Sequence, residues 1–128
     1  MEVQSDELLN AKKLTFTSTD SDLANVDVFI VTVPTPVDNE NQPDLSALKR
    51  ASEIVGGVIR AGNVVIYEST VYPGATEEIC LPIIEKISGL RLNTNFFAGY
   101  SPERINPGDQ SHRLSDITKV TSGSNSKT

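Results

Sequence analysis

The sequence predicts an α/β domain in which three or four mainly parallel strands are flanked by helices. Two observations lead to this prediction. Residues 26–33 and the first part of 64–74 are apolar, β-branched runs of strand length, and an amphipathic helix pattern lies between them. A strand, helix, strand order with a short second connection is typical of parallel strands joined by a crossover helix, which we expect to be right-handed.

Composition and charge narrow the class of protein. The 128 residues fit one domain, and 11 basic against 17 acidic residues give a net charge of −6. This balance disfavours a nucleic-acid groove or an anionic membrane surface, so we expect a small-molecule or protein partner. Cys80 and His112 are the only cysteine and histidine, which predicts no disulfide and no metal site. The acidic N-terminus and the short apolar runs predict a cytoplasmic protein without an export or membrane segment.

The first third of the chain predicts short elements around one buried strand. Residues 5–11 have the pattern of a short helix, and residues 13–19 alternate between apolar and threonine side chains as an edge strand does. Asp20 is a candidate cap for a helix of one or two turns. The run 26–33 then reads as a buried parallel strand that Pro34 ends, because proline cannot donate to the ladder.

Two helices and a third strand follow. Asp44 is the predicted N-cap of a helix that Gly62 stops. Its apolar face repeats every three or four residues at Leu45, Leu48, Ala51, Ile54, Val55, Val58 and Ile59. A second helix pattern runs from Thr76 to Gly89, where Pro82 should kink the helix or delay its start. Residues 96–100 read as a third strand, the chain from residue 106 has loop composition, and residues 121–128 resemble a disordered tail.

Polar side chains follow each of the three buried strands. Thr35, the Ser69–Thr70 pair and Glu103 come directly after the apolar runs. Because the carboxyl ends of parallel strands share one edge of a sheet, these side chains are predicted to line a single crevice suited to a ribose or pyrophosphate. The alternative interpretation is structural: Thr-Pro, Pro-Gly and Ser-Pro are common turn pieces, and Glu103 beside Arg104 is also typical of a solvated surface pair.

Three motifs, in this order and spacing, resemble the UDP-glucose/GDP-mannose dehydrogenase family. They are VTVPTP (31–36), ESTVYPGATEE (68–78) and GYSPERINPG (99–108). The pattern is most similar to the branch that acts on UDP-N-acetylhexosamines in polysaccharide synthesis. The resemblance implies a partial, half Rossmann-like NAD-binding domain. It also implies an enzyme that oxidises the C6 hydroxymethyl group of a UDP-sugar to a carboxylate through a thioester, with two NAD per sugar.

Roles for individual residues follow from the resemblance alone. The segment Val33, Pro34, Thr35, Pro36 and Val37 matches the part that lies along the adenosine ribose and phosphate of NAD, and Ser69 matches a cofactor contact. Thr70 matches the threonine that helps to hold the hydrolytic water, and Glu103 matches the acid/base of thioester hydrolysis. The UDP-glucose branch carries a second glutamate where this chain has Pro107, so that role is not carried over.

Other features of the family have no match in the sequence. There is no GxGxxG turn, and Cys80 does not match the catalytic cysteine in its glycine-rich setting. Residues 1–128 are therefore expected to form a partial NAD-binding domain that lacks its first βαβ unit and is inactive alone, from a parent enzyme that is a homo-oligomer. Two alternatives stay open: a non-catalytic doubly wound module that binds a nucleotide or a protein, and a fragment of a related NAD enzyme such as a hydroxyacid dehydrogenase.

Overall fold

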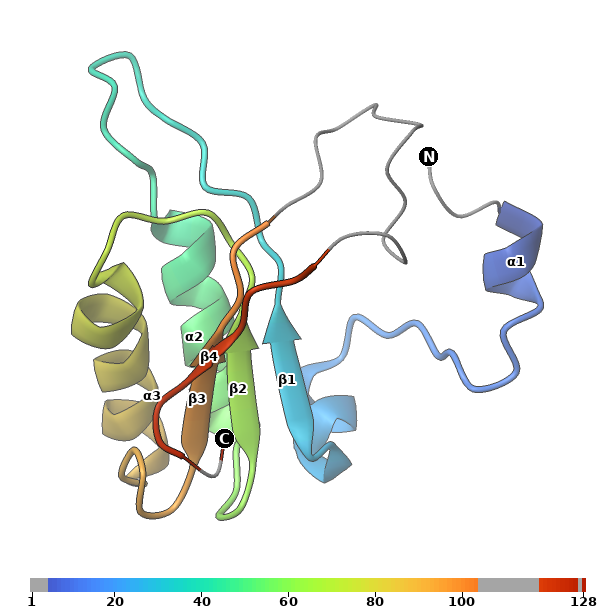
Figure 1. The fold of residues 1–128 in the computed structure, drawn as a ribbon. Helices are drawn as coiled ribbons and strands as arrows, with labels where there is room; N and C mark the ends of the chain where they lie inside the picture. Colours follow the sequence, from blue (N-terminus) through green and yellow to red (C-terminus); the bar gives the residue numbers. More distant parts are fainter. Residues whose placement is uncertain (1–4, 104–117, 127) are drawn as a thin grey trace.

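A four-stranded sheet with two helices on one face forms the body of the protein in the computed structural model (Figure 1). The structure describes residues 5–103, 118–126 and 128. The strand order is β1-β2-β3-β4. β1 (Val28–Val31), β2 (Val64–Tyr67) and β3 (Phe97–Tyr100) are parallel, and β4 (Ser122–Gly123) pairs antiparallel with β3. The predicted mainly parallel α/β sheet is confirmed.

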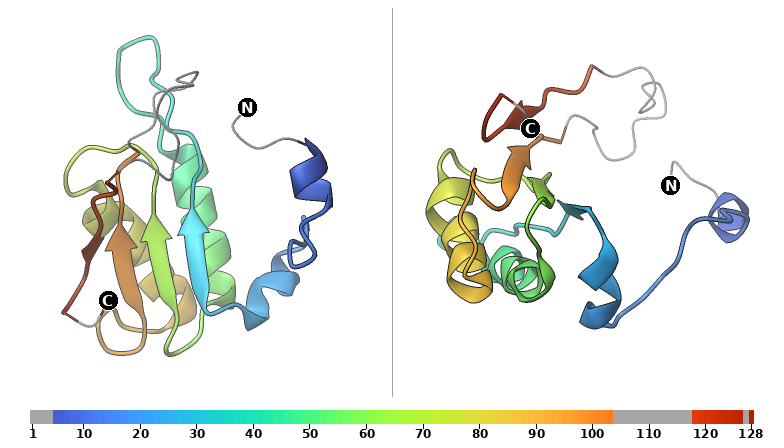
Figure 2. Two further views of the ribbon diagram at one scale, coloured as in Figure 1. Left: turned by 45° about the vertical axis from the view of Figure 1, so that its right-hand side comes forward. Right: turned by 90° about the horizontal axis from the view of Figure 1, so that it is seen from below.

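Helix α2 (Ser46–Val58) connects β1 to β2 and packs beside α3 (Leu81–Ser88), which precedes β3. Figure 2 shows both helices on the same side of the sheet. The two helices are in close contact at Gly56, where a Cβ atom would lie 3.1 Å from Cβ of Ile87 and 3.3 Å from Cα of Ile84. A side chain at position 56 would therefore require Ile87 or the backbone of α3 to shift by a few tenths of an ångström.

The ends of α2 differ in detail from the prediction. Asp44 lies one residue before the backbone cap position, and its Oδ1 accepts the amide N–H of Ser46 at 2.9 Å. These hydrogen bonds from Ser46 lower the pKa of Asp44. The helix ends at Val58, before Gly62, because Ile59 already adopts an extended backbone.

The second helical region begins with a π-helical turn, η2 (Thr76–Cys80), which continues directly into α3. Pro82 is the second residue of α3 and has no N–H to donate, and the π-helical turn before it is closed by the amide of Leu81, which donates to the carbonyl of Thr76. Gly89 then ends the helix in the left-handed conformation, with φ of 69°. The prediction that Pro82 sets a later start for the α-helix is confirmed.

The core lies between the sheet and the two helices and contains one buried polar pair. Its apolar members include Phe29, Val31, Leu48, Val55, Val65, Cys80, Ile84, Phe96 and Ala98. Within it, the Ser52 hydroxyl donates to the carbonyl of Leu48 at 2.9 Å and lies 2.7 Å from the Tyr67 hydroxyl. Because Ser52 has only one hydroxyl proton, Tyr67 must donate to Ser52. Burial raises the pKa of Tyr67 and of the Cys80 thiol.

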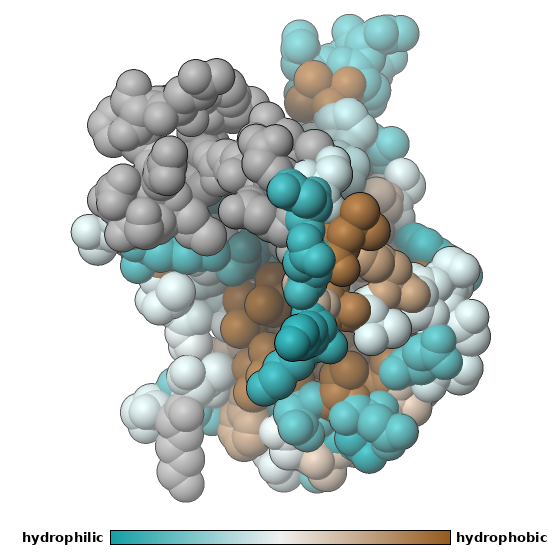
Figure 3. Space-filling model, turned by 90° about the vertical axis from the view of Figure 1, so that its right-hand side faces the viewer, coloured by the Kyte–Doolittle hydropathy of each residue, from teal (hydrophilic) through white to brown (hydrophobic). Residues whose placement is uncertain are grey.

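The opposite face of the sheet carries apolar side chains that no described helix covers. Val28 and Ile30 on β1 are 49% and 58% exposed, whereas their neighbours Phe29 and Val31 are buried. Parallel sheets usually have both faces covered. Figure 3 shows hydrophobic residues at the surface on the side of the molecule that lies to the right in Figure 1.

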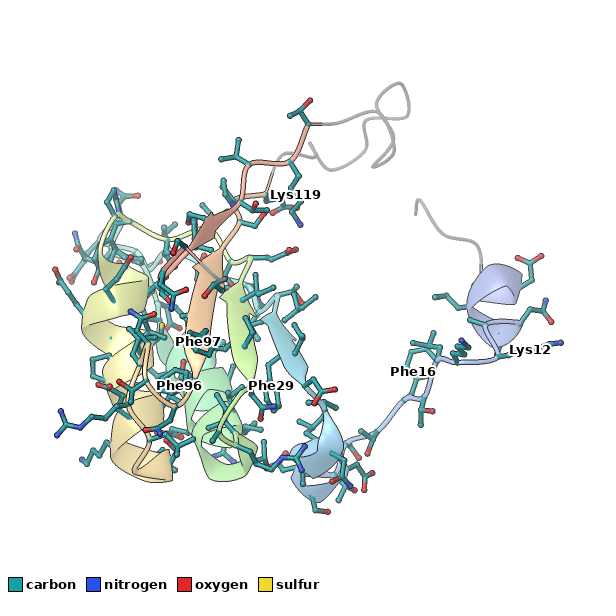
Figure 4. The ribbon with its side chains drawn as sticks, turned by 60° about the horizontal axis from the view of Figure 1, so that its bottom comes forward. Lys12, Phe16, Phe29, Phe96, Phe97 and Lys119 are labelled. Carbon is teal, nitrogen blue, oxygen red and sulfur yellow. The ribbon has the colours of Figure 1, made fainter. Side chains whose placement is uncertain are left out.

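The N-terminal segment corrects one prediction. α1 (Ser5–Leu9) and the 3₁₀ helix η1 (Asp20–Asn25) form, but residues 13–19 are not a strand. Figures 1 and 4 show this segment, with Phe16, extending away from the sheet, and Phe16 is 75% exposed. The alternating pattern alone does not form a strand, because a strand needs a neighbour for its backbone groups.

The C-terminal segment also differs from the prediction. The sequence predicts a disordered tail over 121–128, whereas Ser122–Gly123 forms β4 and the amide of Ser124 donates to the carbonyl of Ala98 at 2.7 Å. Polar composition favours a tail, but the open edge of β3 offers this segment a hydrogen-bonding partner.

The bare apolar face and the free edge of β1 predict that the isolated chain self-associates. Ile30→Lys should shift the chain towards monomer, because a charge on this face is costly to bury. Ala61→Lys, at an exposed turn position, is the control and should leave the distribution unchanged. Size-exclusion chromatography with light scattering measures both, and a wild-type monomer at all concentrations would contradict the prediction.

The buried hydroxyl pair predicts unequal effects of two small substitutions. Ser52→Ala removes the hydroxyl partner of the buried Tyr67 hydroxyl and should cost about 1–3 kcal/mol of unfolding free energy. Tyr67→Phe keeps the bond from Ser52 to Leu48 and should cost less. Equilibrium unfolding in urea measures both changes, and equal losses would contradict the assigned donor.

Tyr67 also predicts a loss of stability in alkali. Its pKa is raised from the usual 10.0, so above pH 10 the unfolded chain releases a proton that the folded chain keeps. Unfolding free energy should therefore fall as pH rises from there, by up to about 1.4 kcal/mol per pH unit. Tyr67→Phe should remove this part of the slope and leave the part from Cys80, whose pKa burial also raises.

Candidate functional site

The ends of β1 and β2 are cross-linked by two side-chain hydroxyls. Ser69, which is buried, donates to the carbonyl of Val33 at 2.6 Å. Thr35 donates to the carbonyl of Thr70 at 2.5 Å. The structure thus brings together the two segments in which the sequence places Thr35, Ser69 and Thr70.

The segment after β1 is a folded loop that projects beyond the strand ends (Figure 1). Its base is closed by the amide of Asp44, which donates to the carbonyl of Pro36 at 2.7 Å. Its tip is organised by the Asp38 carboxylate, which accepts the amides of Glu40 and Gln42. Within the stretch 33–37, Val33 and Thr35 are half-buried, and the other three residues are exposed.

The direction of these bonds decides what the hydroxyls offer to a ligand. Ser69 and Thr35 give their protons to backbone carbonyls, so each retains only acceptor capacity. An acceptor suits the hydroxyl groups of a ribose and does not suit a phosphate oxygen. Thr70 is exposed, and its side-chain hydroxyl is not used in either cross-link. The ribose part of the sequence prediction therefore fits this geometry better than the pyrophosphate part.

The end of β3 lies next to the end of β2. The amide of Ser101 donates to the carbonyl of Tyr67 at 3.0 Å, and Ser101 is buried. Glu103 follows two residues later, is exposed, and forms no hydrogen bond or ion pair with the described residues. Arg104, Pro107 and His112 lie outside the described residues.

The sequence analysis missed an ion pair at this edge. Nζ of Lys119 lies 2.5 Å from Oε1 of Glu68, the residue that leads from β2 to Ser69. The two side chains are 37% and 26% exposed, so the pair is partly withdrawn from water. Glu68 could have been suspected as a charge directly after a buried strand, but nothing local in the sequence connects it to a lysine 51 residues away.

Cys80 does not belong to this edge. Its thiol is fully buried behind the sheet, and burial raises its pKa, so the reactive thiolate is disfavoured. This agrees with its prediction as a packing residue. Among the described residues, no group of three or more His, Cys, Asp or Glu is placed to hold a metal ion. No helix in the described part of the chain has the length and apolar character to cross a membrane.

Comparison with known proteins identifies relatives of the whole chain. Residues 2–128 match the NAD binding domain of the UDP-glucose/GDP-mannose dehydrogenase family. The chain is 63% identical over 124 residues to UDP-N-acetyl-D-glucosamine 6-dehydrogenase of Pseudomonas aeruginosa, covering 97% of this chain and 29% of that protein. It is 55% identical over 122 residues to protein CapL of Staphylococcus aureus, covering 95% of this chain and 28% of that protein.

A solved structure supports the same relationship. UDP-D-ManNAc dehydrogenase from Pyrococcus horikoshii superimposes with a TM-score of 0.67 at 41% identity, over 72% of this chain and 22% of that one. The chain therefore spans less than a third of the length of the curated relatives it matches. Neither the non-catalytic module nor the hydroxyacid dehydrogenase fragment is favoured by these matches.

The hydroxyl cross-links predict a difference between adjacent residues. Ser69→Ala removes the donor to the Val33 carbonyl and should lower the unfolding free energy by about 1–2 kcal/mol. Thr70→Ala keeps its backbone carbonyl as the acceptor for Thr35 and should change stability by less than about 0.5 kcal/mol. Equilibrium denaturation measures both, and equal effects would show that Ser69 does not hold the loop.

Proposed function

Because the chain belongs to the UDP-glucose/GDP-mannose dehydrogenase family, as part of its NAD binding domain, we propose that the whole protein is an NAD-dependent nucleotide-sugar 6-dehydrogenase. It oxidises the C6 hydroxymethyl group of a UDP-N-acetylhexosamine to a carboxylate for polysaccharide synthesis. The observation that carries this proposal is the meeting of the motif segments 31–36 and 68–78 at one edge, with the end of β3 beside them.

The edge formed by the ends of β1 and β2 is the proposed cofactor contact. Val33, Pro34, Thr35, Pro36 and Val37 would lie along the adenosine ribose of NAD, and Ser69 would contact the cofactor as an acceptor. Bound NAD supplies the hydride acceptor for both oxidation steps. The bare edge of β1 supports the further proposal that these 128 residues are half of a dinucleotide-binding domain, completed by strands elsewhere in the protein.

Thr70 and Glu103 are proposed to serve the hydrolytic half of the reaction. The exposed hydroxyl of Thr70 would orient the attacking water, and the Glu103 carboxylate would take a proton from it as the thioester opens. Cys80 is too deeply buried to be the nucleophile. A cysteine and a lysine from another part of the protein must complete the site, so the described chain alone is expected to show no turnover.

Location and assembly form the last part of the proposal. The excess of acidic residues and the single cysteine support a cytoplasmic enzyme. The exposed apolar face of the sheet supports a homo-oligomeric parent whose other segments or subunits cover it.

The proposal predicts the products and a specific block in the full-length enzyme. With UDP-N-acetylglucosamine and NAD, the wild type should form two NADH for each carboxylate. Glu103→Gln should still release two NADH per active site in a first burst and then stall, because both hydride transfers precede hydrolysis. Rapid-mixing absorbance and mass spectrometry of the trapped thioester would measure this.

The control is Glu53→Gln, which removes a carboxylate on the exposed side of α2, and it should leave both phases unchanged. Unimpaired thioester hydrolysis in Glu103→Gln would refute the role of Glu103. A wild type without NADH formation from any UDP-sugar would refute the function itself.

A further inference from the structure

The ion pair between Lys119 and Glu68 connects the two segments that carry the proposed hydrolytic residues. Glu68 lies two residues before Thr70. Lys119 precedes Val120, whose carbonyl accepts the hydroxyl of Ser101 at 3.0 Å, and Ser101 lies two residues before Glu103. Figure 4 shows Lys119 beside the end of β3, away from the arm that carries Phe16.

Each end of the pair is fixed by the backbone. The amide of Glu68 donates to the carbonyl of Val31 at 2.9 Å, which continues the ladder between β1 and β2. On the other side, Lys119 is followed by β4, which pairs with β3. The ion pair is therefore a contact between two anchored positions, and forming it orders little additional backbone.

The short stretch from Glu68 to Thr70 is held towards β1 by the backbone bond of Glu68 and by two hydroxyl bonds. Ser69 and the carbonyl of Thr70 are tied towards the β1 loop. On the side that faces β3, the side-chain contact of this stretch is the bond from Lys119 to Glu68. Glu68 is the less exposed partner, at 26% against 37% for Lys119, and a charged hydrogen bond is stronger and more directional than a neutral one.

We propose that Lys119 and Glu68 are positioning residues that hold the Thr70 and Glu103 segments at the separation needed for thioester hydrolysis. The inference rests on the proposed function. Neither side chain takes part in bond making: Lys119 fixes Glu68, and Glu68 fixes the backbone from which the Thr70 side chain projects. Misplacement of reacting groups by a fraction of an ångström to an ångström is costly to a chemical step, so the pair acts on the rate of hydrolysis and not on cofactor binding.

The test uses the full-length enzyme and separates the two halves of the reaction. Lys119→Met should lower the steady-state rate about tenfold, while the burst of two NADH per site keeps its amplitude and its rate within about twofold and KM for NAD stays unchanged. Lys119→Arg should restore most of the steady-state rate. The double variant Lys119→Met, Glu68→Gln should be no slower than Lys119→Met alone, because the two residues act through one contact.

The matched control is Arg50→Met, which breaks an ion pair of 3.3 Å with Glu53 on the exposed side of α2 and should change neither phase. Equal slowing of burst and steady state in Lys119→Met would show a general structural role and overturn the inference, as would an unchanged steady-state rate. If Lys119→Met does not fold, Glu68→Gln replaces it: the same slowing of the steady state with an unchanged burst is expected. Wild-type enzyme that forms no NADH from any UDP-sugar would refute the proposed function, and the inference with it.

Discussion

The hydrogen bonding of β2 on both sides is the constraint on which the rest of the structure depends. Its last residue, Tyr67, is in register with Val31 of β1 and with Tyr100 of β3. The three parallel strands therefore end at one level, and the segments that follow them leave from one edge of the sheet. The ladder extends one step further on each side, through the amides of Glu68 and Ser101. Without this register, the three motifs would be separate pieces of loop.

Beyond the ends of the strands, side-chain hydroxyls replace the backbone amides as hydrogen-bond donors. β1 ends at Val31 and Pro34 has no amide N–H, so the carbonyl of Val33 lies beyond the ladder and needs a donor from outside it. Ser69 supplies it from the neighbouring segment. The same hydroxyls that make the edge resemble a ligand site thus also satisfy the backbone, and the structural and functional interpretations of Ser69 are compatible. For a ligand at this edge its oxygen would be an acceptor, because its proton is directed inward.

The sequence pattern correctly predicts those elements that depend on residues close together in the chain. The spacing of apolar residues predicts α2, and the missing amide of Pro82 predicts the delayed start of α3, because both depend on a few adjacent residues. Residues 13–19 and Ser122–Gly123 were predicted wrongly because strand formation depends on a partner from elsewhere in the chain. The contact between Lys119 and Glu68 was not predicted for the same reason, because its two residues lie far apart in the sequence. The edge was predictable, whereas the direction of each hydrogen bond within it was not.

The helix contact at Gly56 is linked through α3 and η2 to the segment that follows β2. A Cβ atom at Gly56 would lie 3.1 Å from Ile87 and 3.3 Å from Ile84, and α3 is continuous with η2, which begins six residues after Thr70. Any larger residue at position 56 would move α3 and pull on that segment. The spacing of α2 and α3 at this glycine therefore bears on the position of a segment that Gly56 does not contact. A loss of activity caused by its substitution would easily be mistaken for a simple loss of stability.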